Sequence, residues 1–144
     1  MSAASFEVFL EDVDALGIVY HSRYLQFLER ARVIFFRDLG VDHHAMISDS
    51  KKAFVVSKMA IDFIKPAFLS ETLTVRSQIL KVGMASMICQ QEIFVDKECS
   101  NRLIMSAEVK LALIDLLTYK PVQLPQDIVQ KIQFSKNTIY RIIK

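Results

Sequence analysis

The hydrophobic pattern of the chain changes its period once, from helical to alternating. Between residues 22 and 39, apolar side chains recur at spacings of three and four, which is typical of a helix with one apolar face. Ser22 is a suitable N-cap, and Gly40 is a suitable residue just past the C-terminus. We therefore predict one long helix over residues 22–39, with an apolar face made of Tyr24, Phe27, Leu28, Ala31, Phe35 and Leu39.

Alternating segments, typical of strands, lie on both sides of this helix. Pro66 and Gly83 interrupt the alternation, which predicts strands at residues 6–10, 53–65, 72–82, 84–95 and 102–114, followed by a short helix at 126–133. No helix alternates with the later strands, which argues against a doubly wound parallel sheet. One long helix and a mainly antiparallel sheet of five to six strands bury their apolar faces if the sheet curls around the helix. The pattern therefore predicts an α+β fold in a single domain.

The composition argues against several classes of protein. Of the 144 residues, 52% are hydrophobic and three are Gly, which favours a packed core over disorder. A net charge of +2 is too small to indicate a nucleic-acid partner. No apolar run approaches the roughly 20 residues that span a bilayer. Because no secretion signal is recognisable, we expect a cytoplasmic protein with Cys89 and Cys99 as reduced thiols, and Cys89 as a small buried hydrophobe.

Acidic side chains gather just before the long helix. Asp12 and Asp14 alternate across an extended loop, so we expect them to point to different sides. The first N–H groups of the helix that follows are unpaired and carry its positive dipole end, which can hold a developing oxyanion. A carboxylate that faces a carbonyl polarised in this way suits acyl transfer, as nucleophile or as general base. A loop aspartate is also a common turn former, so both interpretations of Asp14 stay open, and Asp12 and Glu11 are interpreted as loop formers.

Other polar residues near this helix have two interpretations each. His21, at the helix start, either flanks the helix or hydrogen-bonds a substrate or the acid. Glu29, at the edge of the apolar face, either pairs with Arg32 or borders a cleft. The histidines at 43 and 44 have no cysteine or acid at ligand spacing, so no metal site is predicted. A Gly-rich phosphate loop is also absent, and no cofactor is predicted.

Residues 9–32 carry a resemblance to a known family, and they read FLEDVDALGIVYHSRYLQFLERAR. The segment resembles the signature of the hotdog-fold acyl-CoA thioesterases related to 4-hydroxybenzoyl-CoA thioesterase. It is similar above all to their Tol-Pal-associated, YbgC-like branch, whose pattern is roughly YEDTDAGGVVYHxxY followed by FxERAR. The similarity continues in FVVSKM from Phe54, in FIKPA from Phe63 and in the pair Leu124-Pro125, and thus covers about residues 6 to 130.

The resemblance implies a hotdog fold over residues 1–130, with a curved sheet around a central helix. Beyond it, we interpret residues 131–144 as a basic tail from their own sequence. The resemblance also implies a thioester hydrolase that cleaves a fatty or short acyl-CoA, or an acyl-carrier-protein thioester, without a cofactor. In the family the catalytic carboxylate is the second Asp of Asp-x-Asp, which is Asp14 here, and the N–H that polarises the carbonyl falls on His21. The family forms homodimers or homotetramers with active sites between protomers.

Substrate contacts are expected from the same resemblance. The helix start at Tyr20 would help to hold the oxyanion, and the acyl group would lie against the helix and the strand from residue 53. Lys58 would either approach the CoA phosphates or be a structural or solvated side chain. The expected substrate-binding residues are Gly17, Tyr20, Glu29, Phe54, Val56 and Lys58. The chain departs from the family pattern at Val13, Leu16, Ser57, Phe63, Ser70 and Glu71. Leu16 replaces a Gly and removes backbone freedom beside the acid.

Two alternative functions stay open at this point. One is a hotdog dehydratase or hydratase, although the usual His-then-Pro loop of that class is absent. The other is a non-catalytic module that binds an acyl-CoA or acyl-carrier-protein thioester. The tail has alternatives as well: residues 134–144 are basic and amphipathic, and they either dock on their own dimer or contact anionic membrane lipid or a partner protein.

Overall fold

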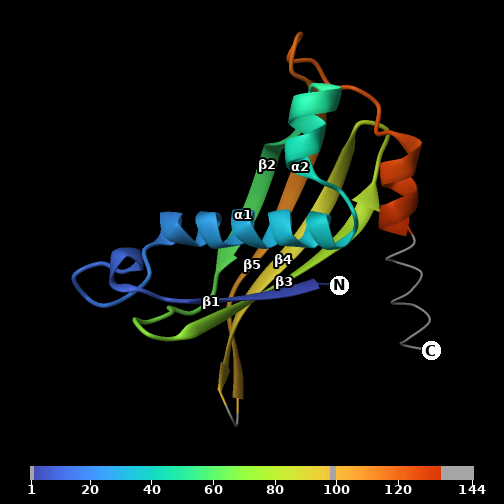
Figure 1. Ribbon diagram of the computed structural model, residues 1–144. Coiled ribbons are helices and arrows are strands. Elements are labelled where there is room, and N and C mark those ends of the chain that lie inside the picture. The colour runs from blue at the N-terminus through green and yellow to red at the C-terminus, as the bar shows by residue number, and fades with distance from the viewer. Residues whose placement is uncertain (1, 98–99, 134–144) are drawn as a thin grey trace, which may run out of the picture.

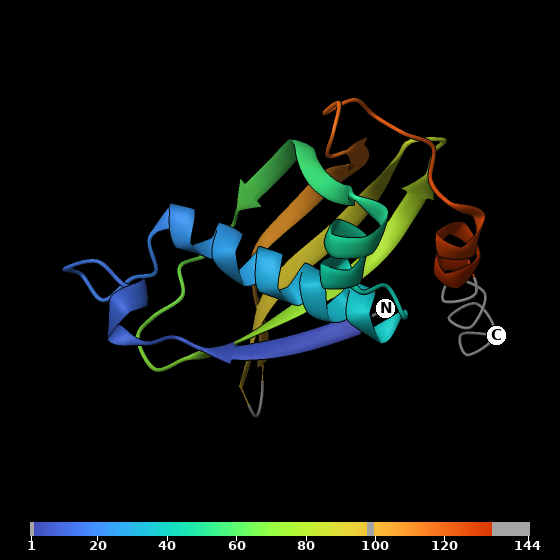
Figure 2. The same ribbon diagram turned by 45° about the horizontal axis from the view of Figure 1, so that its top comes forward.

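The computed structural model describes residues 2–97 and 100–133, and it forms one antiparallel sheet that wraps around one long helix. Helix α1 (His21–Asp38) lies across one face of the sheet, as both ribbon views show (Figures 1 and 2). The strand order is β1-β3-β4-β5-β2, and every neighbouring pair is antiparallel. The strands are β1 (Ser2–Glu7), β2 (Lys52–Phe63), β3 (Thr72–Val82), β4 (Ser86–Lys97) and β5 (Ser100–Asp115). The predicted α+β architecture is confirmed.

Helix α1 buries the face that its spacing predicts and ends where Gly40 permits. Gly40 adopts a φ of +86°, and its N–H donates to the carbonyl of Arg37 at 2.9 Å. The N–H of Val41 donates to the carbonyl of Phe36 at 2.8 Å, which completes a Schellman cap. The predicted N-cap at Ser22 is wrong, because the helix begins one residue earlier. Tyr20 is the N-cap residue, and its side chain does not cap the helix.

The first strand is displaced from its prediction. It spans Ser2–Glu7 and pairs with β3, with Phe6 opposite Leu73. The inward alternation continues to Val8, which is buried, but residues Leu10–Asp12 then form a 3-10 turn. Glu11 and Asp12 therefore lie in this turn, and Asp14 in the loop after it, rather than in the sheet.

The core lies between α1 and strands β3, β4 and β5. Inward positions of β3 follow the predicted alternation through Leu73, Val75, Ser77 and Ile79, all buried. Cys89 is fully buried and unpaired, and this burial raises the pKa of its thiol to about 12. Its prediction as a small buried hydrophobe is confirmed, whereas Cys99 lies outside the described residues.

Strand β2 forms one edge of the sheet and pairs with β5 on its inner side. Its pairing shifts by one residue at Ser57, because Val56 lies opposite Leu111 but Lys58 lies opposite Lys110. This bulge reverses the alternation along the second half of the strand. The short helix α2 (His43–Ala45) and the π-helix η2 (Met46–Ser50) connect α1 to β2.

The predicted terminal helix is present at residues 126–133. Its side chains Ile128 and Ile132 are buried in the core. The predicted contacts of the basic tail at 134–144 fall outside the described residues. No helix in the described part of the chain is long and apolar enough to cross a membrane.

Candidate active site

Residues 13–19 form a tight hairpin that projects beside the N-terminal end of α1 (Figure 1). The backbone hydrogen bonds of this hairpin include those of Asp14. Val13 and Val19 form an isolated antiparallel bridge at its base. The N–H of Asp14 donates to the carbonyl of Ile18 at 3.0 Å, and the N–H of Gly17 donates to the carbonyl of Asp14 at 3.0 Å. Gly17 closes the turn at a φ of +76°, a conformation that favours glycine. The expected substrate-binding residue Gly17 thus shapes the backbone that carries Asp14.

The two carboxylate oxygens of Asp14 have different surroundings. Oδ1 accepts hydrogen bonds from the N–H groups of Leu16 at 2.8 Å and Ile18 at 3.3 Å. Oδ2 accepts none within the described part of the chain, and the side chain is exposed. Asp14 therefore forms the turn with one oxygen and leaves the other for a ligand, so the two interpretations of this residue are compatible.

Asp12 is only 5% exposed, whereas Asp14 is exposed, so the two carboxylates do have different surroundings. Alternation is not the reason, because Asp12 ends the 3-10 turn Leu10–Asp12. Its Oδ2 accepts a hydrogen bond from the N–H of Phe9 at 2.8 Å, and its Oδ1 accepts one from Nε of Arg23 at 2.7 Å. Because Arg23 belongs to the first turn of α1, this ion pair ties the acidic loop to the helix. Asp12 is a loop former, as predicted.

The start of α1 is tied to the same loop. The hydroxyl of Tyr20 donates to the carbonyl of Glu11 at 2.7 Å. His21 is the first residue of the helix, and its exposed ring lies edge-on to Phe63 at 6.4 Å. The first N–H groups of a helix have no intrahelical acceptor, so a positive end faces outward here. No hydrogen bond joins Asp14 to His21 in the described residues, although the hairpin that carries Asp14 ends just before α1.

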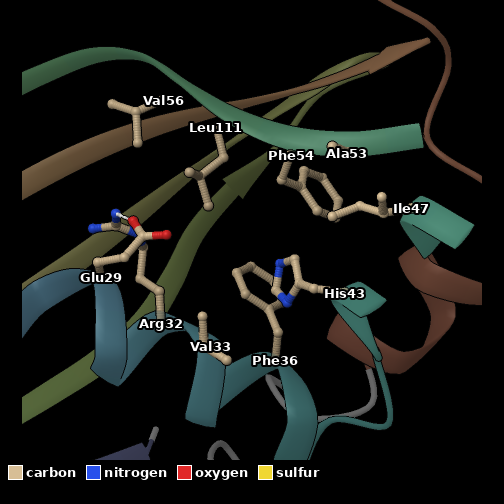
Figure 3. A pocket seen from close by; sticks show the side chains of 10 residues that line it. All are labelled: Glu29, Arg32, Val33, Phe36, His43, Ile47, Ala53, Phe54, Val56 and Leu111. Atoms are coloured by element: carbon tan, nitrogen blue, oxygen red, sulfur yellow. Dashed lines mark hydrogen bonds and ion pairs between the residues drawn. The ribbon is translucent and has the colours of Figure 1, made fainter. Parts of the chain in front are cut away.

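Three of the expected substrate-binding residues, Glu29, Phe54 and Val56, lie around a second feature, a cavity of about 250 Å³ between α1, η2 and β2 (Figure 3). The ring of Phe54 stacks on that of Phe36, with centroids 5.6 Å apart and an angle of 11°. Figure 3 shows these rings at one end and Glu29 at the other. The cavity is lined by Glu29, Arg32, Val33, Phe36, His43, Ile47, Ala53, Phe54, Val56 and Leu111.

The charged end of the cavity is an ion pair between Glu29 and Arg32. Both interpretations of Glu29 therefore hold, since it pairs with Arg32 and borders a cavity. The Arg32 side chain is 6% exposed, and its Nη1 donates to Oε1 of Gln91 at 2.9 Å. The Gln91 amide in turn donates to the carbonyl of Leu28 and to Oγ of Ser77, both at 3.0 Å. This network satisfies a guanidinium that would otherwise be costly to bury.

The sequence interpretation did not identify Arg32 and His43 as cavity residues. Arg32 could have been found from its position, because it lies four residues after Leu28 and four before Phe36 in the apolar stripe. His43 packs edge-on against Phe36 at 5.5 Å, and no sequence signal indicated this. Burial lowers the pKa of His43 below its ordinary value of 6.5, an effect that Glu29 and Asp42 oppose. A neutral imidazole is therefore favoured in the cavity wall.

The structure separates Lys58 from the other expected substrate residues. Beyond the bulge at Ser57, Lys58 lies opposite Lys110 on the outer face of the sheet. It borders a shallow depression there with Ala60, Ile88, Glu108 and Lys110. In the described residues, no cluster of His, Cys, Asp and Glu has the arrangement of a metal site.

Comparisons with known proteins agree with this geometry. A family model described as the Thioesterase-like superfamily matches residues 8–132. The acyl-CoA thioesterase YbgC of Haemophilus influenzae is 38% identical over 84% of this chain and 86% of its own length. A probable thioesterase from Bartonella henselae has a solved structure with a TM-score of 0.79, at 33% identity over 86% of this chain and 98% of that one.

A solved structure of 4-hydroxybenzoyl-CoA thioesterase covers 91% of this chain and 97% of its own, with a TM-score of 0.85 at 15% identity. At this identity the likeness shows the fold, which is the hotdog that the resemblance in residues 9–32 implies. Family match, relatives and fold thus agree, and the chain belongs to the thioesterase-like superfamily as a thioesterase of the hotdog fold.

Proposed function

We propose that the protein hydrolyses acyl-CoA thioesters to a free acid and coenzyme A, with Asp14 as the catalytic carboxylate. The observation that carries this proposal is the state of Asp14: hydrogen bonds to Oδ1 fix its direction, and Oδ2 stays exposed. The name of the Haemophilus influenzae relative, an acyl-CoA thioesterase, supports the substrate class. The identity of the acyl group is left to experiment.

The proposed reaction uses Asp14 and the start of α1 together. Oδ2 either takes a proton from the attacking water or attacks the thioester carbonyl itself and forms a mixed anhydride that water then opens. In both routes the carbonyl oxygen becomes an oxyanion, which the N–H of His21 and the positive helix end stabilise. The C–S bond then breaks and coenzyme A leaves as a thiolate that takes up a proton. Tyr20 holds the helix start to the acidic loop through its bond to Glu11.

The site is proposed to be completed by a second copy of the chain. Strand β2 is a long edge strand, and such edges are usually covered or paired. Two copies that pair β2 with β2 antiparallel about a two-fold axis place the Phe54 end of one strand beside the Phe63 end of the other. Because His21 packs against Phe63, the cavity of one copy then lies beside the helix start of its partner. The proposed assembly is a homodimer, alone or within a homotetramer.

In this arrangement the acyl group enters the cavity lined by Phe54, Val56 and Glu29. The apolar walls favour a hydrocarbon part, at about 0.8 kcal/mol for each buried methylene group. Lys58 lies across the sheet from the cavity and cannot contact an acyl group bound there. A contact between Lys58 and the CoA phosphates stays a prediction.

The test is thiol release from a panel of acyl-CoAs by the wild-type protein and by Asp14→Asn. We expect turnover by the wild type and a large loss in the variant. Undiminished turnover in Asp14→Asn would remove Asp14 from the mechanism. Tight binding in calorimetry without any product would favour the binding module, and an enoyl product would favour the dehydratase. A single turnover in isotopically labelled water, followed by analysis of Asp14, separates the nucleophile from the general base.

The shared site is tested by mixing two inactive variants. Asp14→Asn removes the proposed base, and Val56→Arg fills the cavity. If each site combines Asp14 of one copy with the cavity of the other, mixed dimers contain one intact site, and mixing and reassociation restore activity. A mixture that forms mixed dimers but stays inactive contradicts the shared site.

A further inference from the structure

A second carboxylate, Glu71, lies just before β3 and makes several contacts although it has no place in the reaction above. Its side chain is 9% exposed. Nη2 of Arg102 lies 2.6 Å from Oε1 and 2.8 Å from Oε2, and Nζ of Lys97 lies 3.4 Å from Oε2. Oε1 also accepts the N–H of Phe68 at 2.8 Å. The carboxylate thus joins two strands to the segment at residues 67–69.

That segment is the support on which the Asp14 hairpin rests. Ile18 forms an isolated bridge with Phe68. The N–H of Leu69 donates to the carbonyl of Gly17 at 3.1 Å. On the other flank, the N–H of Val19 donates to the carbonyl of residue 67 at 3.0 Å. The backbone at residues 67–69 therefore determines where the hairpin stands relative to the sheet.

The support segment is a turn that needs its side-chain contacts. Ser70 adopts a φ of +71°, in the left-handed region that disfavours residues with a Cβ. The turn closes through the N–H of Glu71, which donates to the carbonyl of Phe68 at 3.1 Å. The Glu71 carboxylate holds the N–H of Phe68 from the other side. Without this carboxylate, the turn loses the hydrogen bond to the N–H of Phe68, which holds the backbone in its strained conformation.

Charge explains why the acceptor at this position is a carboxylate. The Arg102 side chain is 25% exposed, and its buried Nε has no hydrogen-bond partner among the described residues. The two contacts of its Nη2 with Glu71 are therefore the main compensation for the partly buried guanidinium. In return, Arg102 holds the Glu71 side chain in the direction that meets Phe68.

We propose that Glu71 is a positioning residue for the thioesterase reaction, which holds the Phe68 backbone and thereby sets the position of the Asp14 hairpin. The proposal rests on the proposed role of Asp14 and adds a residue that does not touch the substrate. Displacement of a reacting group by about 1 Å through a distant substitution can lower a rate about 10²-fold. Because other residues line the cavity, a displaced hairpin should lower kcat and leave KM nearly unchanged.

The test compares Glu71→Gln with Glu71→Met. Both variants lose the charge of Glu71, but only Gln keeps an oxygen that accepts the N–H of Phe68. We expect Glu71→Met to lower kcat about 10²-fold, with KM within about threefold of the wild type, and Glu71→Gln to keep most of kcat. Equal kcat values in the two variants, measured where both are folded, would overturn the proposal.

The matched control is Asp115→Leu at the end of β5, which removes a side-chain acceptor from a turn as Glu71→Met does. Oδ1 of Asp115 accepts the N–H groups of Leu117 at 2.7 Å and Thr118 at 3.3 Å, and Tyr119 in that turn has a φ of +57°. The turn thus resembles the Glu71 turn but does not contact the Asp14 hairpin. We expect kcat to be unchanged in Asp115→Leu. A loss equal to that in Glu71→Met would mean that Glu71 only stabilises the fold and does not position the Asp14 hairpin.

Two further measurements keep the outcome decisive. If Glu71→Met does not fold, Glu71→Asp keeps the charge and shortens the side chain by one methylene group. A loss of kcat in Glu71→Asp supports the proposal, and an unchanged kcat overturns it. Asp14→Asn, measured in parallel, distinguishes failures: if Asp14→Asn is fully active, the proposed function itself has failed, whatever Glu71 does.

Discussion

Asp12 and Asp14 are two residues apart in one loop, and their carboxylates have opposite surroundings. Asp12 is buried, and both of its oxygens accept strong hydrogen bonds, from Phe9 and Arg23. Asp14 is exposed and uses one oxygen within its own turn. An aspartate thus fixes the loop at position 12, whereas at position 14 an aspartate keeps one oxygen without a hydrogen bond from the described residues. The comparison shows that pairing, rather than residue type, separates a structural acid from a candidate catalyst.

The largest expected effect is on catalysis by Asp14→Asn. The amide keeps an oxygen for the bonds from Leu16 and Ile18, so the hairpin should keep its conformation. We expect a loss of about 10²–10⁴-fold in kcat/KM and a change in unfolding free energy within about 0.5 kcal/mol. Thiol release and chemical denaturation measure the two quantities. A marked loss of stability would mean that Asp14 is structural in the same way as Asp12.

Asp12→Ala should give the reverse result. It leaves Arg23 without its carboxylate and the N–H of Phe9 without an acceptor. We expect the free energy of unfolding to fall by about 1–3 kcal/mol, with the activity of the folded fraction within about tenfold of the wild type. Thermal unfolding and activity below the transition provide the measurements. If activity falls as far as in Asp14→Asn while the protein stays folded, the division of roles between the two acids is wrong.

A smaller effect is expected from Leu16→Gly. Leu16 is 79% exposed, so its side chain adds little to the core, but its N–H orients Asp14. Glycine gives the unfolded chain more freedom, and we expect a loss of about 0.4–1 kcal/mol in stability and a fall of a few-fold in kcat. Unchanged kcat would show that the hairpin does not need a stiff backbone beside the acid.

The smallest effect is expected at His43. Burial lowers the pKa of its imidazole below the ordinary value. Below a pH of about 6.5 the unfolded chain binds a proton that the folded chain resists. The contribution of His43 to stability is therefore present above that pH and is lost as the pH falls towards the lower folded value. We expect His43→Gln to flatten this slope in denaturation measured across that range. An identical slope in wild type and variant would contradict a neutral His43.

Local patterns predicted the elements that local physics determines. The apolar stripe of α1 and the alternation of β3 were correct because each follows directly from the geometry of a helix or a strand. The burial of Asp12 and the exposure of Asp14 do not follow from alternation, because residues two apart in extended backbone lie on the same face, and Asp12 instead ends a 3-10 turn. The cap at Ser22 was wrong, because Tyr20 is fixed instead by a bond to Glu11 that lies outside the helix.

Contacts between distant segments could not be predicted in this way. Gln91 meets Arg32 across 59 residues of sequence, and Glu71 meets Arg102 across 31. No periodicity encodes such meetings, because they depend on how the sheet curves around α1. The position of Lys58 belongs to the same class, since a bulge of one residue decides which face of the sheet it occupies.

The bulge at Ser57 also means that the inward-facing positions of β2, where substitutions are least tolerated, follow a different alternation in each half of the strand. Before the bulge, Phe54 and Val56 face the cavity; after it, Met59 and Ile61 pack towards the core, and Lys58 faces outward. Ser57 is the extra residue, so its deletion would leave Lys58 opposite Lys110 and every later side chain of the strand on its present face. A deletion beyond the bulge would instead shift the pairing by one residue and turn the later side chains to the other face. Away from Ser57, insertions and deletions in β2 should therefore be far less tolerated than substitutions. Directed evolution of this strand should preserve its pairing with β5 before its composition.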